Sequence, residues 1–383
     1  MQQQIKPFQE PPVRIPGMIM LGAAGRNAGK TEFACSLIKK LALSHQVMGI
    51  KVTTVHDRDA GCPRGENRCG ACTSFAGSMC LSQEDGTSAS KDTARMLSAG
   101  AGRVFWLRIH KESLAGSLSV LRRLTGAGGL VVCESNSLRL VVEPDLFIVI
   151  RDSRNEAIKP SCLEVIDLAD AVVGSDGSSF TLPPEDLVVA GEHWTFKRDA
   201  AAVVLAGGAS RRMGTDKAML TINGRPMIQQ IIDQIQPSFR KVYVSAGKKD
   251  LYGFTGCEVI QDATPGEGPL AALASVLERS EYDLNFMTPC DVPDTDQHLV
   301  AALMRGIGDA DAAVPLSPDG RREPLFAVYR KSALPAIRAA IARGEKRIIR
   351  FYDSVQVKDV FTDSTGWISN LNTSEDYRKY SGS

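Results

Sequence analysis

Two apolar segments of this sequence, each long enough for a buried strand, run directly into a glycine-rich and basic loop. The first is MIMLGAAGRNAGKTEF at 18–33, and the second is AAVVLAGGASRRMGTDKAML at 201–220. Glycine has no Cβ and tolerates unusual φ and ψ, so such a loop lets its backbone approach a ligand closely. Where the loop leads into a helix, the free N–H groups attract phosphate. Both halves of the chain are therefore predicted to bind phosphorylated ligands.

The rest of the chain alternates apolar, strand-like runs with amphipathic, helix-like runs in both halves. This alternation is typical of α/β folds with parallel strands. A length of 383 residues favours two domains, since single domains usually span about 100–200 residues. Helices are expected to begin near Thr31 and Lys111, and to lie near 225–237, 269–280, 295–306 and 332–343.

A segment rich in Gly, Ser and Pro lies between the two halves and then returns to a strand pattern, which favours a domain boundary there. We expect a flexible leader at 1–16, a first domain at 17–190, a linker at 191–199 and a second domain at 200–383. The first domain carries a cysteine-rich insertion at 58–85.

Charge and hydropathy exclude several classes of function. Lys and Arg number 45 against 44 Asp and Glu, so nothing favours binding to nucleic acid or to an anionic membrane. No apolar run approaches the roughly 20 residues that span a bilayer, and the first residues lack the apolar core of a signal peptide. We expect a cytoplasmic protein, in which the nine cysteines are thiols or metal ligands rather than disulfides.

The first loop, AGRNAGKT at 24–31, fits a relaxed phosphate-loop pattern. Gly25 and Gly29 would expose the backbone, Lys30 would neutralise the β- and γ-phosphates, and the Thr31 hydroxyl would bind Mg²⁺. Glu134 closes the predicted strand GLVVCE. It either serves the metal or orients water, or it is a strand-end acid that faces solvent.

Three segments of the first half, GAAGRNAGKTEFA, GIKVTTVHD and VVCESNSL, resemble the small GTP-binding adaptor of molybdopterin guanine dinucleotide synthesis, MobB. The resemblance implies a Rossmann-like, three-layer P-loop NTPase fold for 17–190 that binds GTP. It also implies an apo-molybdoenzyme or its chaperone as a partner. The histidine-rich stretch of that family corresponds here only to Lys51, His56 and Asp57, and His56 alone is equally typical of an ordinary loop histidine.

Four cysteines cluster in the insertion: Cys62, Cys69, Cys72 and Cys80, with the spacing C-x6-C-x2-C-x7-C. Four thiolates in a loop without hydrophobic periodicity suit a tetrahedral Zn²⁺ site or an iron–sulfur cluster. A bound metal would give order to a segment that has no core of its own. The spacing does not decide between the two metals, and free thiols on a disordered insertion are the alternative.

The second loop carries Arg212 and Lys217, which would meet the charge of a nucleoside triphosphate. LAGGASRRMGTDKAML at 205–220 follows the pattern L-A-G-G-x-S-x-R-M-G-x-D-K, in which it resembles the molybdenum cofactor guanylyltransferases, MobA. The further blocks of that family follow in the same order: QDATPGEGPLAAL (261–273), FMTPCDVP (286–293), EPLFAVYR (323–330), GEKRIIRF (344–351) and NLNTSEDY (370–377).

The resemblance implies a second Rossmann-like, three-layer domain, with a nucleotidyltransferase fold of the GT-A type, and it assigns roles to residues. Lys217, Arg212 and Asp291 would be catalytic, and Asp291 would also bind Mg²⁺. Asp291 has the alternative of capping the next helix, and the pair Lys346–Arg347 is either phosphate-binding or a solvated helix end. The nucleotide would be bound by Leu205, Ala206, Gly207, Gly208, Ser245 and Asp262. The pterin would be bound by Asn370, Asn372 and Thr373, with Lys346 and Arg347.

The expected reaction transfers GMP from GTP to molybdenum-molybdopterin, giving molybdopterin guanine dinucleotide and pyrophosphate. The attacking phosphate is already an anion, which explains why the motifs offer cations and glycines rather than a catalytic histidine. Relatives selective for cytosine usually show Leu-Ala-Ala-Gly, so Gly207 and Gly208 favour guanine. The alternatives are a cytidylyltransferase or other nucleotidyltransferase, and a first domain that is a non-catalytic binding or delivery module.

Overall fold

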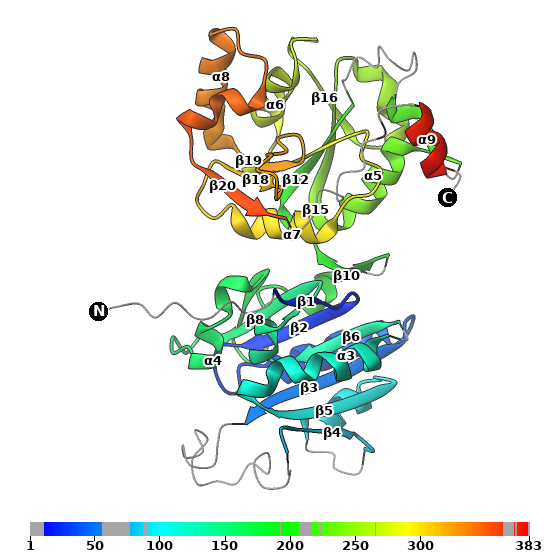
Figure 1. The fold of residues 1–383 in the computed structure, drawn as a ribbon, viewed down its shortest axis with the longest axis vertical. Coiled ribbons are helices and arrows are strands. Elements are labelled where there is room, and N and C mark those ends of the chain that lie inside the picture. Colours follow the sequence, from blue (N-terminus) through cyan, green and yellow to red (C-terminus); the bar gives the residue numbers. More distant parts are fainter. Residues whose placement is uncertain are drawn as a thin grey trace. The chain divides into compact units, whose positions relative to one another are not determined.

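The computed structural model describes residues 11–55, 77–86, 91–126, 128–191, 193–206, 217–222, 224–264, 266–362, 371 and 374–381. The chain divides into two compact units, residues Met1–Thr195 (unit 1) and Phe196–Ser383 (unit 2). Each unit is built around one central sheet (Figure 1). Among the described residues, no helix has both the length and the apolar character needed to cross a membrane.

The described part of unit 1 contains a seven-stranded sheet in the order β4-β5-β3-β6-β2-β8-β9. Neighbouring strands are parallel except β4, which is antiparallel to β5. The sheet is thus mixed, whereas the alternation of strands and helices predicts parallel pairing. The insertion interrupts that alternation, and the chain returns from it along the edge of the sheet in the opposite direction. The strands are β2 (Met18–Ala23), β3 (Val47–Val55), β4 (Met79–Gln83), β5 (Arg103–His110), β6 (Leu130–Glu134), β8 (Leu146–Asp152) and β9 (Ala171–Ser175).

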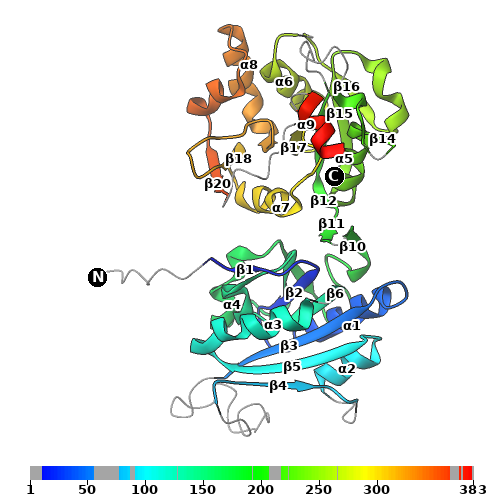
Figure 2. The same ribbon diagram turned by 45° about the vertical axis from the view of Figure 1, so that its right-hand side comes forward.

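Helices cover both faces of this sheet (Figure 2). Helices α1 (Lys30–Leu41) and α2 (Asp92–Ser98) lie on one face. Helices α3 (Ser117–Thr125) and α4 (Pro160–Leu163) lie on the other, over a core that includes Met18 and Met20 of β2. The helix predicted to begin near Lys111 starts as a 3-10 turn at Lys111–Gly116 and becomes α-helical only at Ser117.

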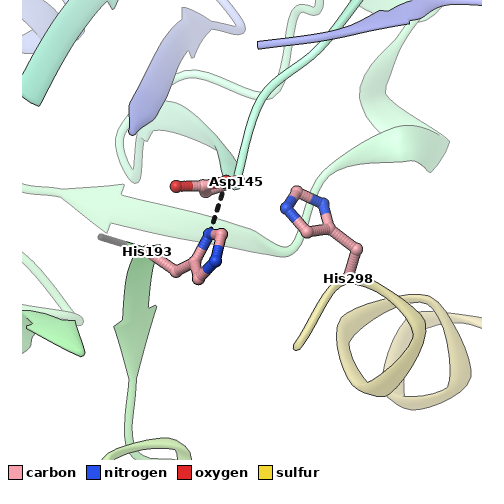
Figure 3. Close-up of side chains that lie close together, drawn as sticks. All are labelled: Asp145, His193 and His298. Carbon is pink, nitrogen blue, oxygen red and sulfur yellow. Dashed lines mark hydrogen bonds and ion pairs between the residues drawn. The ribbon is translucent and has the colours of Figure 1, made fainter. Parts of the chain in front are cut away.

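A buried carboxylate holds the end of unit 1 to its sheet. Asp145, which is 5% exposed, accepts hydrogen bonds from the backbone N–H groups of Gly17 (2.9 Å) and Trp194 (3.2 Å). Its other oxygen lies 3.3 Å from Nδ1 of His193 (Figure 3). These contacts hold the start of β11 (His193–Phe196) beside the start of β2. The minor strand pairs are β1 (Val13–Arg14) with β7 (Val142–Glu143), and β10 (Leu187–Ala190) with β11.

Unit 2 has a sheet in the order β16-β15-β12-β17-β19-β18-β20, again seven strands among the described residues. It is also mixed, because β19 is antiparallel to both of its neighbours. The strands are β12 (Arg198–Leu205), β15 (Phe239–Ala246), β16 (Glu258–Gln261), β17 (Leu284–Pro289), β18 (Ala312–Leu316), β19 (Ala327–Arg330) and β20 (Val357–Phe361), with the hairpin β13 (Thr221–Ile222) and β14 (Arg225–Pro226) outside the sheet.

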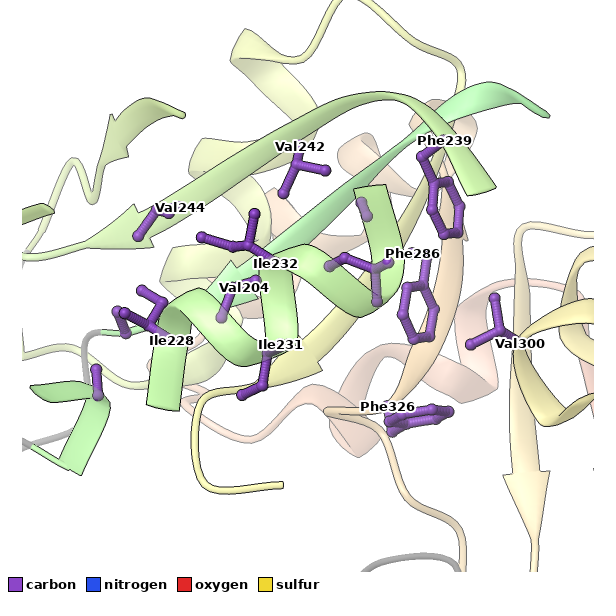
Figure 4. Packing of buried hydrophobic residues seen from close by; sticks show 14 of the residues in the cluster. Val204, Ile228, Ile231, Ile232, Phe239, Val242, Val244, Phe286, Val300 and Phe326 are labelled. Carbon is purple, nitrogen blue, oxygen red and sulfur yellow. The ribbon is translucent and has the colours of Figure 1, made fainter. Parts of the chain in front are cut away.

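The apolar run of β12 is explained by burial on both of its faces. Ala202 and Val204 point into one core, which α5 and α7 complete (Figure 4). Ala201 and Val203 point into a second core, which α6 and α8 complete. Side chains alternate along a strand, so a central strand covered on both faces is apolar throughout its covered part, here Ala200 to Val204. The helices are α5 (Met227–Ile235), α6 (Pro269–Arg279), α7 (Gln297–Gly306), α8 (Leu334–Ala342) and α9 (Ser374–Ser381).

Candidate functional site

The carboxyl ends of β12, β15 and β17 meet at one edge of the unit 2 sheet. Leu205, the last residue of β12, is in register with Ser245 of β15 and Pro289 of β17. The backbone continues these pairings beyond the strands, since the Ala206 N–H donates to the Ser245 carbonyl at 2.8 Å. Ligands of α/β sheets bind outside the carboxyl ends of parallel strands. The predicted residues Gly207, Gly208 and Arg212 follow here but lie outside the described residues.

A cation and a carboxylate face each other at this edge. Nζ of Lys217 lies 3.1 Å from Oδ2 of Asp291, and the two side chains are 18% and 22% exposed. Asp291 does not cap the next helix, because the carboxylate of Asp296 accepts hydrogen bonds from the first N–H groups of α7. The helix-capping alternative is therefore wrong for α7. The structure instead pairs two of the three residues predicted to be catalytic.

The two polar residues predicted near the nucleoside also contact each other. The Ser245 hydroxyl donates a hydrogen bond to Oδ1 of Asp262 at 2.8 Å. Burial raises the pKa of Asp262, and the hydrogen bond from Ser245 opposes this only in part. Tyr252, which sequence reasoning missed, donates from its hydroxyl to the Ala206 carbonyl at 3.1 Å. Tyr252 lies in a short 3-10 segment, and no sequence motif points to it.

A second carboxyl group near Asp291 was also missed. Burial raises the pKa of Glu323, and the negative charge of Asp291 adds to this effect. Glu323 is the first residue of the block EPLFAVYR, and the buried Phe326 follows it closely. The sequence block was recognised, but nothing in it linked this glutamate to Asp291, which is far away along the chain.

The residues predicted to meet the pterin are described only in part. Asn370, Asn372 and Thr373 lie outside the described residues. Between them, Leu371 is 4% exposed, and its N–H donates to the backbone carbonyl of Asp291 at 2.9 Å. The structure therefore brings this segment against the Asp291 backbone.

The block at 344–351 contacts the block at 261–273. Nζ of Lys346 lies 2.9 Å from Oε2 of Glu267, and both side chains are more than half exposed. Gly268 has φ of +96°, and a Cβ there would lie 3.2 Å from the Lys346 carbonyl. Arg347 precedes the 3-10 helix Ile348–Ser354. Both interpretations of the Lys346–Arg347 pair, phosphate-binding and solvated, stay open.

Unit 1 contains a cavity of about 810 Å³ around its phosphate loop. That volume lies within the range of about 300–1,000 Å³ usual for ligand sites. The loop holds Gly29 at a φ of +86°, which favours glycine, and a Cβ there would lie only 3.2 Å from Oγ of Ser175, which also lines the cavity. All the predicted loop residues line this cavity: Gly25, Gly29, Lys30 and Thr31.

Glu134 is buried next to this loop. The residue is 1% exposed, and its Oε2 lies 3.7 Å from Nζ of Lys30. The alternative of a strand-end acid that faces solvent is therefore wrong. Within the part of the chain that the structure describes, neither carboxylate oxygen of Glu134 accepts a hydrogen bond.

Lys51, predicted from the second strand, lines the cavity together with Asp92, which sequence reasoning missed. The two side chains form an ion pair. Burial by itself raises the pKa of Asp92, but hydrogen bonds from Lys51 and Thr31 and the nearby lysine charges outweigh it, so the pKa is lowered. The sequence KDT at 91–93 carried no signal that Asp92 faces the phosphate loop.

Most of the predicted insertion lies outside the residues that the structure describes. His56, Asp57, Cys62, Cys69 and Cys72 lie outside the described residues. Cys80, however, belongs to β4, and its Sγ accepts a hydrogen bond from Nη2 of Arg108 at 3.2 Å. The expectation that the segment 58–85 lacks regular structure is therefore wrong at 79–83, where it pairs with the edge of the sheet. Metal binding by the four cysteines stays a prediction.

Comparison with known proteins supports the assignment of unit 2. Residues 202–357 match the family model of the MobA-like NTP transferase domain. A molybdenum cofactor guanylyltransferase of Shewanella piezotolerans is 33% identical over 186 residues, which are 47% of this chain and 91% of the relative. One of Yersinia pestis is 35% identical over 178 residues, 45% of this chain and 91% of the relative.

Among solved structures, molybdopterin-guanine dinucleotide biosynthesis protein A of Archaeoglobus fulgidus aligns with 22% identity and a TM-score of 0.42, over 48% of this chain and 97% of that one. The sequence relatives decide the assignment, because each is matched along nine-tenths of its length. The family predicted from the blocks of the second half is confirmed. Through its second half, the chain belongs to the molybdenum cofactor guanylyltransferases and is an enzyme of the nucleotidyltransferase class.

Proposed function

We propose that unit 2 transfers GMP from GTP to molybdenum-molybdopterin, releasing pyrophosphate and forming molybdopterin guanine dinucleotide. The observation that carries this proposal is the Lys217–Asp291 pair at the carboxyl edge of β12 and β17. The Ser245–Asp262 pair lies at the ends of neighbouring strands of the same sheet. A cation for phosphates and polar groups for a nucleoside thus share one edge of the sheet.

The residues of this edge fit a magnesium-dependent reaction. Carboxylate oxygens are the ligands that Mg²⁺ prefers. A second carboxyl group, that of Glu323, is close enough to Asp291 for the charge of Asp291 to raise its pKa. Mg²⁺ bound at Asp291 would act as a Lewis acid toward the phosphates. Lys217 would stabilise the negative charge that develops during transfer. A phosphate oxygen of the pterin attacks the α-phosphorus of GTP, the new P–O bond forms, and the bond to the leaving pyrophosphate breaks.

Guanine is the base we propose, since Gly207 and Gly208 match the guanine-selective form of the loop. The second candidate is a cytidylyltransferase or another nucleotidyltransferase. The test incubates the purified full chain with molybdopterin, Mg²⁺ and each nucleoside triphosphate, and measures pyrophosphate and dinucleotide product. We expect turnover with GTP that is lost in Asp291→Ala. Equal turnover with CTP, or a fully active Asp291→Ala protein, contradicts the assignment.

For unit 1 we propose a P-loop NTPase fold that binds GTP and acts as an adaptor toward pterin or an apo-molybdoenzyme. The phosphate loop and its cavity of about 810 Å³ support this role. The alternative is a binding or delivery module that does not hydrolyse GTP. Basal GTP hydrolysis, measured together with co-purification of an apo-molybdoenzyme, separates the two. Lys30→Met should abolish nucleotide binding in either case, and unchanged stoichiometry of bound GTP contradicts the proposal.

A further inference from the structure

The entrance to the phosphate loop of unit 1 is held largely by one side chain. Ala23, the last residue of β2, and Ala24, the first of the loop, have four backbone polar groups between them. The Ala24 N–H donates to the Ile150 carbonyl at 2.8 Å, and the Ala24 carbonyl accepts from the Lys159 N–H at 2.8 Å. Both groups of Ala23 bond to Asn136: the N–H donates to its Oδ1 at 2.8 Å, and the carbonyl accepts from its Nδ2 at 3.0 Å.

The Asn136 amide takes the place of a strand that ends early. The pairing of β2 with β6 stops at Leu21, and one last bond follows, from the Ser135 N–H to the Leu21 carbonyl at 3.0 Å. The chain then enters the 3-10 helix Ser137–Leu140. A side-chain amide offers the same kinds of donor and acceptor as a peptide group. Asn136 therefore extends the pairing of β2 as far as Ala23 without a further strand residue.

This substitution leaves space for a ligand beside the loop. Asn136 and Ala23 both line the cavity of unit 1, and Asn136 is 6% exposed. Gly22 makes room for the amide, because a Cβ there would lie 3.1 Å from Oδ1 of Asn136. A longer β6 would bring its own side chains to this place. The sheet thus stays hydrogen-bonded up to the loop while the cavity next to the loop is kept open.

We propose that Asn136 is a positioning residue for the phosphate loop: its amide holds Ala23, so that the loop is formed before a triphosphate binds. The inference rests on the proposed binding of GTP by unit 1. A loop that is already ordered loses little freedom when its ligand binds, and this raises the affinity. Lys30 and Thr31 would contact the phosphates, whereas Asn136 acts on them through the backbone of Ala23.

A purely structural role of Asn136 leads to a different expectation. If its two hydrogen bonds only stabilise the sheet, their loss lowers the free energy of unfolding and leaves the affinity of the folded protein unchanged. Buried backbone groups without partners are costly, so without the amide Ala23 shifts toward other partners and takes the start of the loop with it. The affinity of the folded protein therefore separates the two roles.

The test measures binding of a GTP analogue with a β,γ-imido bridge to the full chain in Mg²⁺, by equilibrium titration, with folding checked by circular dichroism. The Lys30→Met protein reports binding at unit 2 alone, and its signal is subtracted. Asn136→Ala removes both bonds to Ala23. Asp170→Ala is the matched control, because the Asp170 carboxylate also bonds to the backbone of the sheet, at the Phe147 N–H at 2.8 Å, and neither residue is among the described ones that line the cavity.

Asn136→Ala should bind the analogue at least about 10-fold more weakly than wild type, which corresponds to about 1.4 kcal/mol. Asp170→Ala should bind within about 2-fold of wild type, even if its unfolding midpoint falls as far. A folded Asn136→Ala protein that binds within about 3-fold of wild type, or an equal loss in both variants, overturns the inference and leaves the binding of GTP intact. Wild type that binds no more than Lys30→Met overturns the proposed function of unit 1, and the inference with it.

If Asn136→Ala does not fold, Asn136→Asp decides. A protonated carboxyl group has the shape of the amide and keeps both a donor and an acceptor, whereas the carboxylate only accepts. Burial favours the protonated form as pH falls. Compared with wild type at the same pH, Asn136→Asp should bind at least about 10-fold more weakly at about pH 8 and recover to within about 3-fold at about pH 5.5. An equal loss at both pH values, or no loss at either, overturns the inference.

Discussion

Replacing Lys217 with methionine removes the one described cation that contacts Asp291 through its side chain. Nζ of Lys217 lies 3.1 Å from Oδ2 of Asp291, with side chains only 18% and 22% exposed. Charges interact more strongly in such a shielded place than in water. Loss of one preorganised group that stabilises developing charge typically lowers kcat by about 10²–10³, or about 2.7–4 kcal/mol. We expect a loss of that size in Lys217→Met.

The assay is release of pyrophosphate from GTP in the presence of molybdopterin and Mg²⁺. KM for GTP should also rise, because Asp291 is left without this partner and repels the triphosphate. Lys241→Met is the matched control, since Lys241 forms an exposed pair with Glu258 at 3.2 Å, and kcat should change less than about 2-fold. A Lys217→Met protein with normal unfolding and with kcat within about 3-fold of wild type would refute the reasoning.

Three further predictions concern stability and metal content. Burial raises the pKa of Asp262 in the folded chain above its value in the unfolded chain. Ionisation of Asp262 therefore lowers the free energy of unfolding as pH rises from the unfolded pKa to the folded one. Asp262→Asn should be more stable than wild type at pH 7 but not at acidic pH, as measured by urea unfolding. Gly268→Ala should lose about 1–3 kcal/mol, because its φ of +96° and ψ of 178° suit only glycine. Gly253→Ala, where a Cβ meets nothing within 4 Å, should unfold like wild type, and equal denaturation midpoints for the two variants contradict the argument. Cys69→Ser and Cys72→Ser should each lose one Zn²⁺ or one iron–sulfur cluster per chain, while guanylyl transfer persists. Elemental analysis and visible absorption of anaerobically purified protein measure the metal. A wild-type protein without stoichiometric metal contradicts the metal site.

Local features of the sequence were enough to place many elements and to identify the family. The run AAAVVL predicts a buried strand, and the side chains from Ala200 to Val204 of β12 do enter one of two cores in alternation. Helices α5, α6, α7 and α8 lie within the predicted ranges, since their apolar spacing is readable along the chain. Ordered blocks across the second half identified the guanylyltransferases, and the relatives confirm this.

Only the tertiary structure decided which polar groups meet. Lys217 and Asp291 are 74 residues apart, and Lys51 and Asp92 are 41 residues apart. Such pairs depend on strand order and on direction, as with the antiparallel β4 and β19, and periodicity within one segment carries no information on either. The burial of Glu134 could not be predicted either, because the sequence pattern of a carboxylate at the end of a strand is the same whether the side chain is solvated or buried. The sequence thus identified which residues can bind phosphate or metal, whereas the packing of distant segments determined the partners and the burial of those residues.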